Sequence, residues 1–146
     1  MDIAASAAGL VVTAPLQLAV AVIVRQVHGS PVLFRQQRPG KDGEIFELLK
    51  FRSMKNPETG QETDEERLTQ LGRFLRSTSL DELPSLWNVL KGDMSLVGPR
   101  PEVPRYMALY PEDARQRILS LRPGITDRAA IEFRDEERLL AASADP

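Results

Sequence analysis

The sequence predicts an α+β fold with an apolar N-terminal segment, a short β-hairpin and several amphipathic helices around one small core. Residues 3–24 are almost wholly apolar, which is typical of a helix that is buried or lies in a membrane. A turn signal at residues 40–43 separates two short β-prone runs. Beyond residue 64 apolar residues recur at helical spacing, and a chain of 146 residues is long enough for one small domain.

Composition excludes several classes of function. The chain has no cysteine, which excludes disulfide frameworks, thiolate zinc sites and cysteine nucleophiles. Its formal net charge of -2 gives no bulk attraction to nucleic acid, so no nucleic-acid partner is expected. The one histidine, His28, has no Gly-x-Ser-x-Gly motif beside it, so a surface or boundary position fits it better than a catalytic triad.

Residues 3–24 are the segment best suited to a membrane. As one straight helix they would extend about 33 Å, just enough to cross a bilayer core. Pro15 stands near the centre, where proline removes a backbone hydrogen bond and kinks or breaks the helix. A kinked span, a helix–break–helix that enters and leaves on one side, and a buried helix of a soluble domain all remain compatible. Membrane association is favoured.

Turn signals and periodicity place the other elements. We expect strands at residues 31–38 and 44–51 and a polar loop at residues 56–66. We expect helices at residues 64–76, about 80–91 and 111–121. Trp87 belongs to the apolar stripe of the second helix, which favours a core position over a sugar-stacking one. The charged tail from Asp127 is compatible with a further helix.

Asp81 and Glu82 are the strongest candidates for chemistry. Ser79 is a candidate N-cap with Glu82 closing a capping box, although a cap at Leu80 or Asp81 suits Pro84 equally well. Each of these N-cap positions puts both carboxylates at the positive end of a helix dipole, which lowers a carboxyl pKa. Adjacent helical positions point about 100° apart. One carboxylate could therefore attack while its neighbour holds a metal or moves a proton.

Basic residues near this pair suit a phosphate-binding rim. Arg100 stands in Gly98-Pro99-Arg100-Pro101, where the prolines restrict the backbone around a guanidinium that can fork onto phosphate oxygens. Lys50 and Arg52 end the second predicted strand, and Arg76 stands shortly before the carboxylates. Together with the carboxylate pair, these cations indicate phosphoryl chemistry.

The chain resembles the bacterial sugar transferase family, the monotopic polyprenol-phosphate phosphoglycosyl transferases. The motifs are highly specific and run in unbroken order from Asp2 through the Pro15 break. They are Gly29-Ser30-Pro31-Val32-Leu33-Phe34-Arg35-Gln36, Arg38-Pro39-Gly40, Lys50-Phe51-Arg52-Ser53-Met54, the stretch from Ser79 to Pro101, and Arg122-Pro123-Gly124-Ile125-Thr126.

The resemblance implies a re-entrant membrane helix over residues 1–28, broken near Pro15, and a catalytic domain over residues 29–146 at the cytoplasmic face of the cell membrane. It implies transfer of a phosphosugar from a nucleoside diphosphate sugar, expected to be a UDP-sugar, to polyprenol phosphate, with release of UMP. This is the first membrane step in the synthesis of a glycoconjugate such as an exopolysaccharide, O-antigen, capsule or glycoprotein. Both substrates and membrane lipid are therefore the expected partners.

The resemblance also assigns roles to residues. The aspartate of the carboxylate pair is the family's nucleophile, so Asp81 would form a phosphosugar–enzyme intermediate. Mg²⁺ is the expected cofactor, held by Asp81 and Glu82, and Glu82 would alternatively assist proton transfer. Arg100 would hold phosphate oxygens.

Two departures from the family pattern bear on these expectations. The basic residues usual before Asp2 are missing, and Asp127-Arg128 stands in place of the usual Gly-Trp. The chain stops at Pro146, short of the family's C-terminal helical region, so we expect a truncated, small catalytic-core form. Neither the sugar nor the oligomeric state follows from the sequence.

Two other functions stay open at this point. A membrane-bound, Mg²⁺-dependent phosphohydrolase would open the same phosphoenzyme with water, and sustained turnover without polyprenol phosphate would identify it. A catalytically silent, membrane-anchored module would bind neither Mg²⁺ nor a nucleotide sugar.

Overall fold

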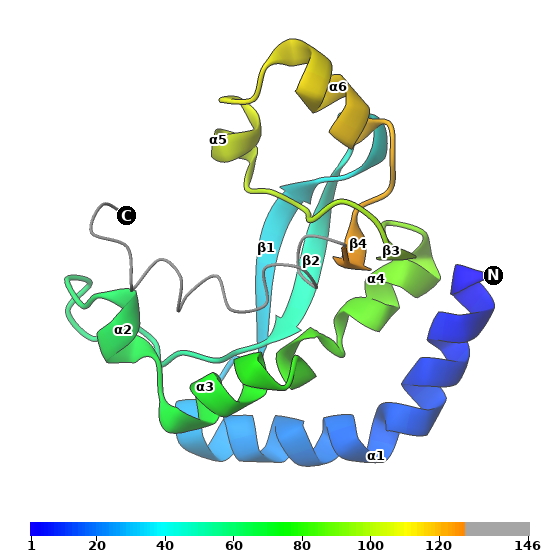
Figure 1. Ribbon diagram of the computed structural model, residues 1–146. Helices are drawn as coiled ribbons and strands as arrows, with labels where there is room; N and C mark the ends of the chain where they lie inside the picture. Colours follow the sequence, from blue (N-terminus) through cyan, green and yellow to red (C-terminus); the bar gives the residue numbers. More distant parts are fainter. Residues whose placement is uncertain (128–146) are drawn as a thin grey trace.

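The computed structural model describes residues 1–127 and confirms a mixed helix-and-sheet architecture (Figure 1). The expected helix beyond Asp127 lies outside the described residues. In chain order the elements are α1 (Asp2–His28), β1 (Leu33–Pro39), η1 (Lys41–Gly43), β2 (Ile45–Phe51), α2 (Asp64–Arg67), α3 (Gln70–Ser77), η2 (Leu80–Glu82), α4 (Ser85–Lys91), β3 (Ser95–Val97), α5 (Pro104–Met107), α6 (Glu112–Leu119) and β4 (Gly124–Thr126).

Helix α1 stays continuous through Pro15 and changes direction near its middle (Figure 1), so the expected break is a bend within one helix. Pro15 lacks the N–H that would reach the carbonyl of Val11. Close by, the Thr13 hydroxyl donates to the Gly9 carbonyl oxygen at 2.6 Å, a bond that often bends helices. By length and composition α1 is able to cross a membrane, and most of its apolar side chains are exposed.

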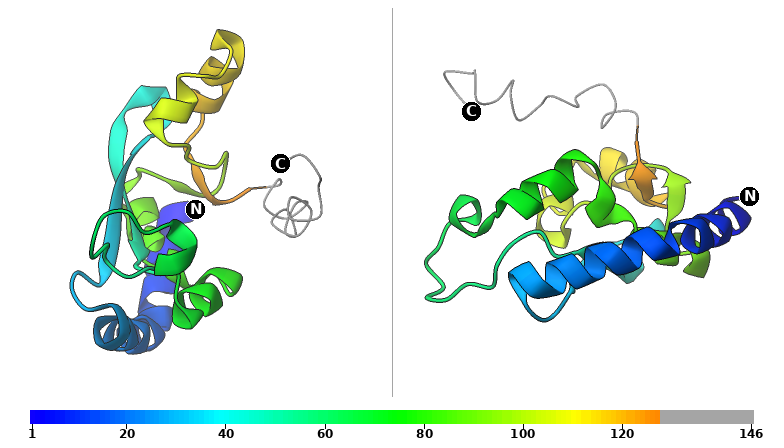
Figure 2. Two further views of the ribbon diagram at one scale, coloured as in Figure 1. Left: turned by 90° about the vertical axis from the view of Figure 1, so that its left-hand side faces the viewer. Right: turned by 90° about the horizontal axis from the view of Figure 1, so that it is seen from below.

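Strands β1 and β2 form the predicted antiparallel hairpin, from Leu33 opposite Phe51 to Pro39 opposite Ile45. The turn between them includes Gly43, whose φ of 79° is a conformation that glycine adopts without strain. Figure 2 shows the hairpin running lengthwise between α1 and the lobe formed by α5 and α6. The hairpin is therefore the element on which the others assemble.

Two apolar clusters take the place of the single core that the sequence predicts. The first joins α1 and α3 to the end of β2 through Val20, Val24, Phe51 and Leu75. The second joins the rest of β2 to α4 and the residue before β3 through Phe46, Leu48, Val89 and Met94. Full burial of one such side chain contributes about 1.5–3 kcal/mol. The core is divided because Phe51 lies on the face of β2 opposite to Phe46 and Leu48.

The helix expected over residues 64–76 is two helices. Thr69 leaves the helical conformation and caps α3, because its hydroxyl oxygen accepts a hydrogen bond from the Gly72 N–H at 3.0 Å. At Gly72 an added Cβ would lie 1.9 Å from the carbonyl oxygen of Ser53. This close approach seats α3 on the chain that leaves β2.

The structure decides the positions expected for His28 and Trp87. His28 is buried at the boundary between α1 and α3, with Nε2 2.7 Å from Thr69 Oγ1, so the boundary position was right and a surface position would be wrong. Trp87 is 50% exposed, so its assignment to the core was wrong. Helix α4 buries Ser85, Asn88 and Val89 instead, and this orientation leaves Trp87 outside.

Strands β3 and β4, which the sequence did not predict, form a short parallel pair with Ser95 opposite Gly124 and Val97 opposite Thr126. Their backbones approach so closely at Gly98 that an added Cβ would lie 2.4 Å from the carbonyl oxygen of Arg122. This pairing brings two distant motifs together, the loop that carries Arg100 and the Arg122-Pro123-Gly124 turn.

We expect Gly72→Ala to lower the thermal unfolding midpoint, because the new methyl group would force α3 away from Ser53. Overpacking of this kind costs about 1–3 kcal/mol or more. Thermal unfolding in detergent measures it, with the exposed Ser77→Ala on the same helix as the control. Equal midpoints for the two variants would show that α3 does not depend on this contact.

Candidate active site

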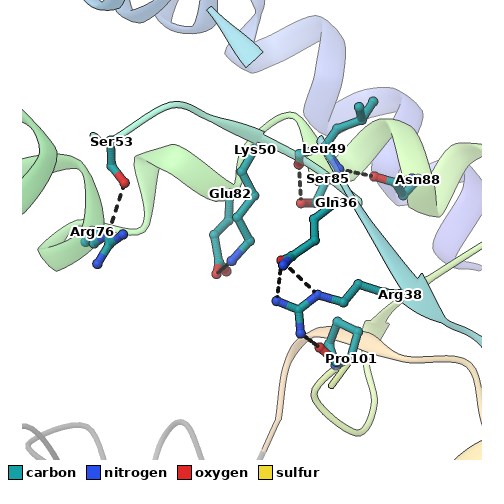
Figure 3. A network of polar contacts seen from close by, with 10 residues as sticks. All are labelled: Gln36, Arg38, Leu49, Lys50, Ser53, Arg76, Glu82, Ser85, Asn88 and Pro101. Carbon is teal, nitrogen blue, oxygen red and sulfur yellow. Dashed lines mark hydrogen bonds and ion pairs between the residues drawn. The ribbon is translucent and has the colours of Figure 1, made fainter. Parts of the chain in front are cut away.

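Two buried polar side chains hold α4 against the open edge of β2. Asn88 Oδ1 accepts from the Leu49 N–H at 3.1 Å, and Asn88 Nδ2 donates to the Glu47 carbonyl oxygen at 2.7 Å. Ser85 Oγ donates to the Leu49 carbonyl oxygen at 2.7 Å (Figure 3). Within residues 1–127 the only ladder partner of β2 is β1, so these bonds satisfy backbone groups that no strand reaches.

The carboxylate pair lies in η2, directly before α4, and this corrects its expected place in the first turn of an α-helix. Ser79 adopts a left-handed conformation with φ 56° and makes no side-chain capping bond, so the expected capping box is absent. The Glu82 carboxylate is bonded to Lys50 instead.

Asp81 is a buried carboxylate among charged neighbours. The residue is only 8% exposed. Burial raises the pKa of Asp81 above its ordinary value; Lys50 opposes that rise, Glu82 adds to it and Arg76 opposes it more weakly. The raised pKa corrects the lowering predicted from a helix dipole. A carboxylate that is already poorly hydrated has little water to lose before it attacks a substrate.

Three further predicted residues surround Asp81. Lys50 Nζ lies 2.6 Å from Glu82 Oε1 in a half-buried, charge-assisted hydrogen bond. Arg76 Nε donates to Ser53 Oγ at 3.0 Å, which aims the guanidinium from the end of α3 (Figure 3). The structure therefore brings Lys50, Arg76 and both carboxylates into one charged cluster.

Arg52 lies away from this cluster. Its buried guanidinium donates to the carbonyl oxygens of His28 and Ser30 and, at 2.6 Å, to Asn56 Oδ1. Burial lowers the pKa of Arg52. In this structure Arg52 ties the end of α1 and the following hinge to the end of β2.

Arg100 is exposed in the loop between β3 and α5, and within residues 1–127 no hydrogen bond or ion pair joins it to either carboxylate. The loop is held from two sides. Arg38 Nη1 donates to the Pro101 carbonyl oxygen at 2.7 Å, and the Gly124 N–H donates to the Pro99 carbonyl oxygen at 3.0 Å.

Sequence reasoning assigned no role to four residues that shape the site: Ser53, Ser85, Asn88 and Arg38. No sequence signal marks them. Ser85 and Asn88 lie off the apolar stripe of Leu83, Leu86, Trp87 and Leu90, so the spacing gives no reason to bury them. Ser53 and Arg38 each bond a residue that is distant in the sequence.

Few protein side chains would be available to hold the expected Mg²⁺. Asp81 and Glu82 supply two neighbouring carboxylates, and in the described part of the chain no group of three or more metal-binding side chains occurs. Mg²⁺ is often bound by one or two carboxylates together with substrate phosphates. The pair fits a cation bound in that way, and Asp81 and Glu82 would be its ligands.

The chain belongs to the bacterial sugar transferase family, which it matches over residues 1–144. It is 45% identical over 137 residues to EpsL, an uncharacterized sugar transferase of Bacillus subtilis, covering 92% of this chain and 67% of that protein. The predicted family is thereby confirmed.

Two further relatives have more specific names. A UDP-glucose:undecaprenyl-phosphate glucose-1-phosphate transferase of Caulobacter vibrioides is 41% identical over 140 residues, covering 90% of this chain and 52% of that protein. A UDP-N-acetylgalactosamine-undecaprenyl-phosphate N-acetylgalactosaminephosphotransferase of Aeromonas hydrophila is 39% identical over 139 residues, covering 90% of this chain and 33% of that protein. The chain therefore spans about half the length of the Caulobacter relative and about a third of the length of the Aeromonas relative.

We expect Asn88→Ala to destabilise the protein by roughly 2–4 kcal/mol, because it leaves two buried backbone groups of β2 without partners. Chemical denaturation in detergent measures the change. The exposed Lys91→Ala on the same helix should stay within about 0.5 kcal/mol of the wild type. A comparable effect of both variants would mean that the edge of β2 is satisfied in another way.

We expect Asp81→Asn to be at least as stable as the wild type at pH 7 with chelator present. Because folding raises the pKa of Asp81, the cost of burying its charge is present above the folded pKa and fades as the pH falls toward the ordinary value. The amount by which the unfolding midpoint of Asp81→Asn exceeds that of the wild type should therefore shrink as the pH falls from 7 to about 4.

Asp42→Asn, the same change at an exposed turn, is the control for this prediction. A lower midpoint for Asp81→Asn at pH 7, with no dependence on pH, would contradict it.

Proposed function

We propose that this chain carries the catalytic residues of a polyprenol-phosphate phosphoglycosyl transferase that uses a UDP-sugar. The observation that carries the proposal is the buried Asp81 carboxylate beside Glu82, Lys50 and Arg76. Family membership and the names of the relatives support the general reaction. The products would be polyprenyl diphosphate sugar and UMP, at the first membrane step of glycoconjugate synthesis.

In the first step, a carboxylate oxygen of Asp81 attacks the phosphorus that is bonded to the sugar. A new O–P bond forms, the bond from that phosphorus to the bridging oxygen breaks, and the electron pair leaves with UMP. Asp81 then carries the phosphosugar as an acyl phosphate.

In the second step, an anionic oxygen of polyprenol phosphate attacks the same phosphorus. The bond between phosphorus and Asp81 breaks, the carboxylate is regenerated and polyprenyl diphosphate sugar is released. Neither step requires a general base, because both attacking oxygens are already anionic.

The cations around Asp81 allow an anionic nucleophile to approach an anionic substrate. Lys50 and Arg76 reduce the repulsion between the carboxylate and a diphosphate, and Lys50 also holds Glu82 in place. Arg100 would bind phosphate oxygens from its exposed loop. Mg²⁺, when bound, would add Lewis-acid neutralisation of phosphate charge.

We also infer that α1 is re-entrant and the protein monotopic, at the cytoplasmic face of the cell membrane. Both ends of α1 contact the same folded body. Ser95 Oγ on β3 donates to the Asp2 carboxylate at one end, and His28 lies against Thr69 at the other. A span would separate these ends by a bilayer, whereas the bend near Pro15 keeps them on one side.

We expect wild-type protein to gain the mass of one phosphosugar when incubated with Mg²⁺ and UDP-glucose or UDP-N-acetylgalactosamine without acceptor. Asp81→Asn should gain none, because an amide is a far weaker nucleophile, and Asp42→Asn should label like the wild type. Intact-protein mass spectrometry makes the measurement. Equal labelling of wild type and Asp81→Asn would exclude Asp81 as the nucleophile, and sustained UMP release without polyprenol phosphate would favour the phosphohydrolase.

We expect single cysteines placed by Ala4→Cys and Gln26→Cys to react with a membrane-impermeant maleimide on the same side of the membrane. The chain has no cysteine of its own, so each label reports one position. In intact spheroplasts both should be protected, and permeabilisation should expose both. Labelling of only one position in intact spheroplasts would show a span.

A further inference from the structure

We propose that Arg38 is a positioning residue for Arg100, and that it fixes the Arg100 loop to the strand pair that carries Lys50. This inference rests on the proposed function, in which Arg100 binds phosphate oxygens of the donor. Neither the carboxylate cluster nor the family membership of the chain assigns a role to Arg38.

The guanidinium of Arg38 is held as a fork between two chain segments. Its Nε and Nη2 donate to Gln36 Oε1 at 3.1 and 2.6 Å, and its Nη1 donates to the Pro101 carbonyl oxygen at 2.7 Å (Figure 3). Three of its five N–H groups are thereby directed by two acceptors. Lysine cannot reproduce this arrangement, because an ammonium group is a point charge without a planar fork.

The contact acts directly beside Arg100. Pro101 is the next residue, and proline restricts the backbone of the residue before it, so fixing the Pro101 carbonyl limits the conformations open to Arg100. On the opposite side, Gly98 N–H donates to the Thr126 carbonyl oxygen at 3.0 Å. The loop is thus held between β4 and the side chain of Arg38.

The strand register connects this contact to the carboxylate cluster. Phe34 lies opposite Lys50 and Gln36 lies opposite Leu48. Because cross-strand partners share a face and alternate residues repeat it, Gln36, Arg38 and Lys50 lie on one face of the hairpin. A phosphate held by Arg100 would therefore be kept at a fixed position relative to Lys50.

The charges around Arg38 suit an anionic ligand at this place. Burial lowers the pKa of Arg38, Glu102 opposes that effect and the neighbouring Arg100 adds to it. Because the half-buried Arg38 guanidinium repels the exposed Arg100 guanidinium nearby, a diphosphate bound by Arg100 would relieve that repulsion without touching Arg38.

The test compares the UDP affinity of the wild type with that of variants. UDP is the probe because it contains the diphosphate of every UDP-sugar donor. The affinity is measured, with Mg²⁺ present, from the rise of the unfolding midpoint as the UDP concentration increases. We expect Arg38→Lys to weaken UDP binding about tenfold, and Gln36→Met to weaken it several-fold. Gln36→Glu should recover most of what Gln36→Met loses, since a carboxylate accepts the same fork. Arg35→Lys, on the same strand but the opposite face, is the matched control and should bind UDP like the wild type.

A double variant separates positioning from direct contact. If Arg38 acts through Arg100, Arg38→Lys combined with Arg100→Lys should bind UDP within about twofold of Arg100→Lys alone. If the double variant instead loses UDP affinity by the product of the two single losses, the positioning role would be overturned, and Arg38 would be shown to touch the ligand itself. UDP binding by Arg38→Lys equal to that of the wild type, or no recovery in Gln36→Glu, would overturn the proposal outright. Failure of the wild type to bind UDP would instead contradict the proposed function.

Discussion

The structure depends first on the hydrogen bonds that Ser85 and Asn88 make to the open edge of β2. Both side chains are almost fully buried and all of the described bonds at this edge are short enough to be strong. Only Leu83 and Pro84 separate α4 from η2, so the position of α4 determines the position of the carboxylate pair. The edge contact therefore sets Asp81 and Glu82 beside Lys50, the penultimate residue of the same strand.

The site is arranged at a cost to stability. A buried carboxylate with a raised pKa is unfavourable when ionised, and the nearby cations reduce that cost without removing it. Functional sites commonly carry such costs, which the rest of the fold must offset. Here the two apolar clusters and the edge bonds of β2 provide that stability, and a substrate with phosphate groups would meet a cluster that is already assembled.

Helix α1 and the hairpin together define how the site faces its surroundings. The bend near Pro15 allows Asp2 and His28 to contact the same body, and Arg52 anchors the hinge after α1 instead of lining the phosphate rim. The same hairpin carries Lys50 at one end of a face and Arg38 farther along it. The proposed membrane attachment, nucleophile and phosphate contacts would therefore be linked through β1 and β2.

Features that depend on local sequence were predictable, because their physical causes lie within a few residues. These include the apolar N-terminal segment with a distortion at Pro15 and the hairpin, whereas the separate 3₁₀ turn that holds Asp81 and Glu82 was not predicted. Tertiary structure alone decided that Trp87 is exposed, that Arg52 is structural, that β3 pairs with β4, and that Arg38 reaches Pro101. Each of these depends on a partner distant in sequence, and hydrogen-bond geometry and burial exist only once the two segments have been brought together.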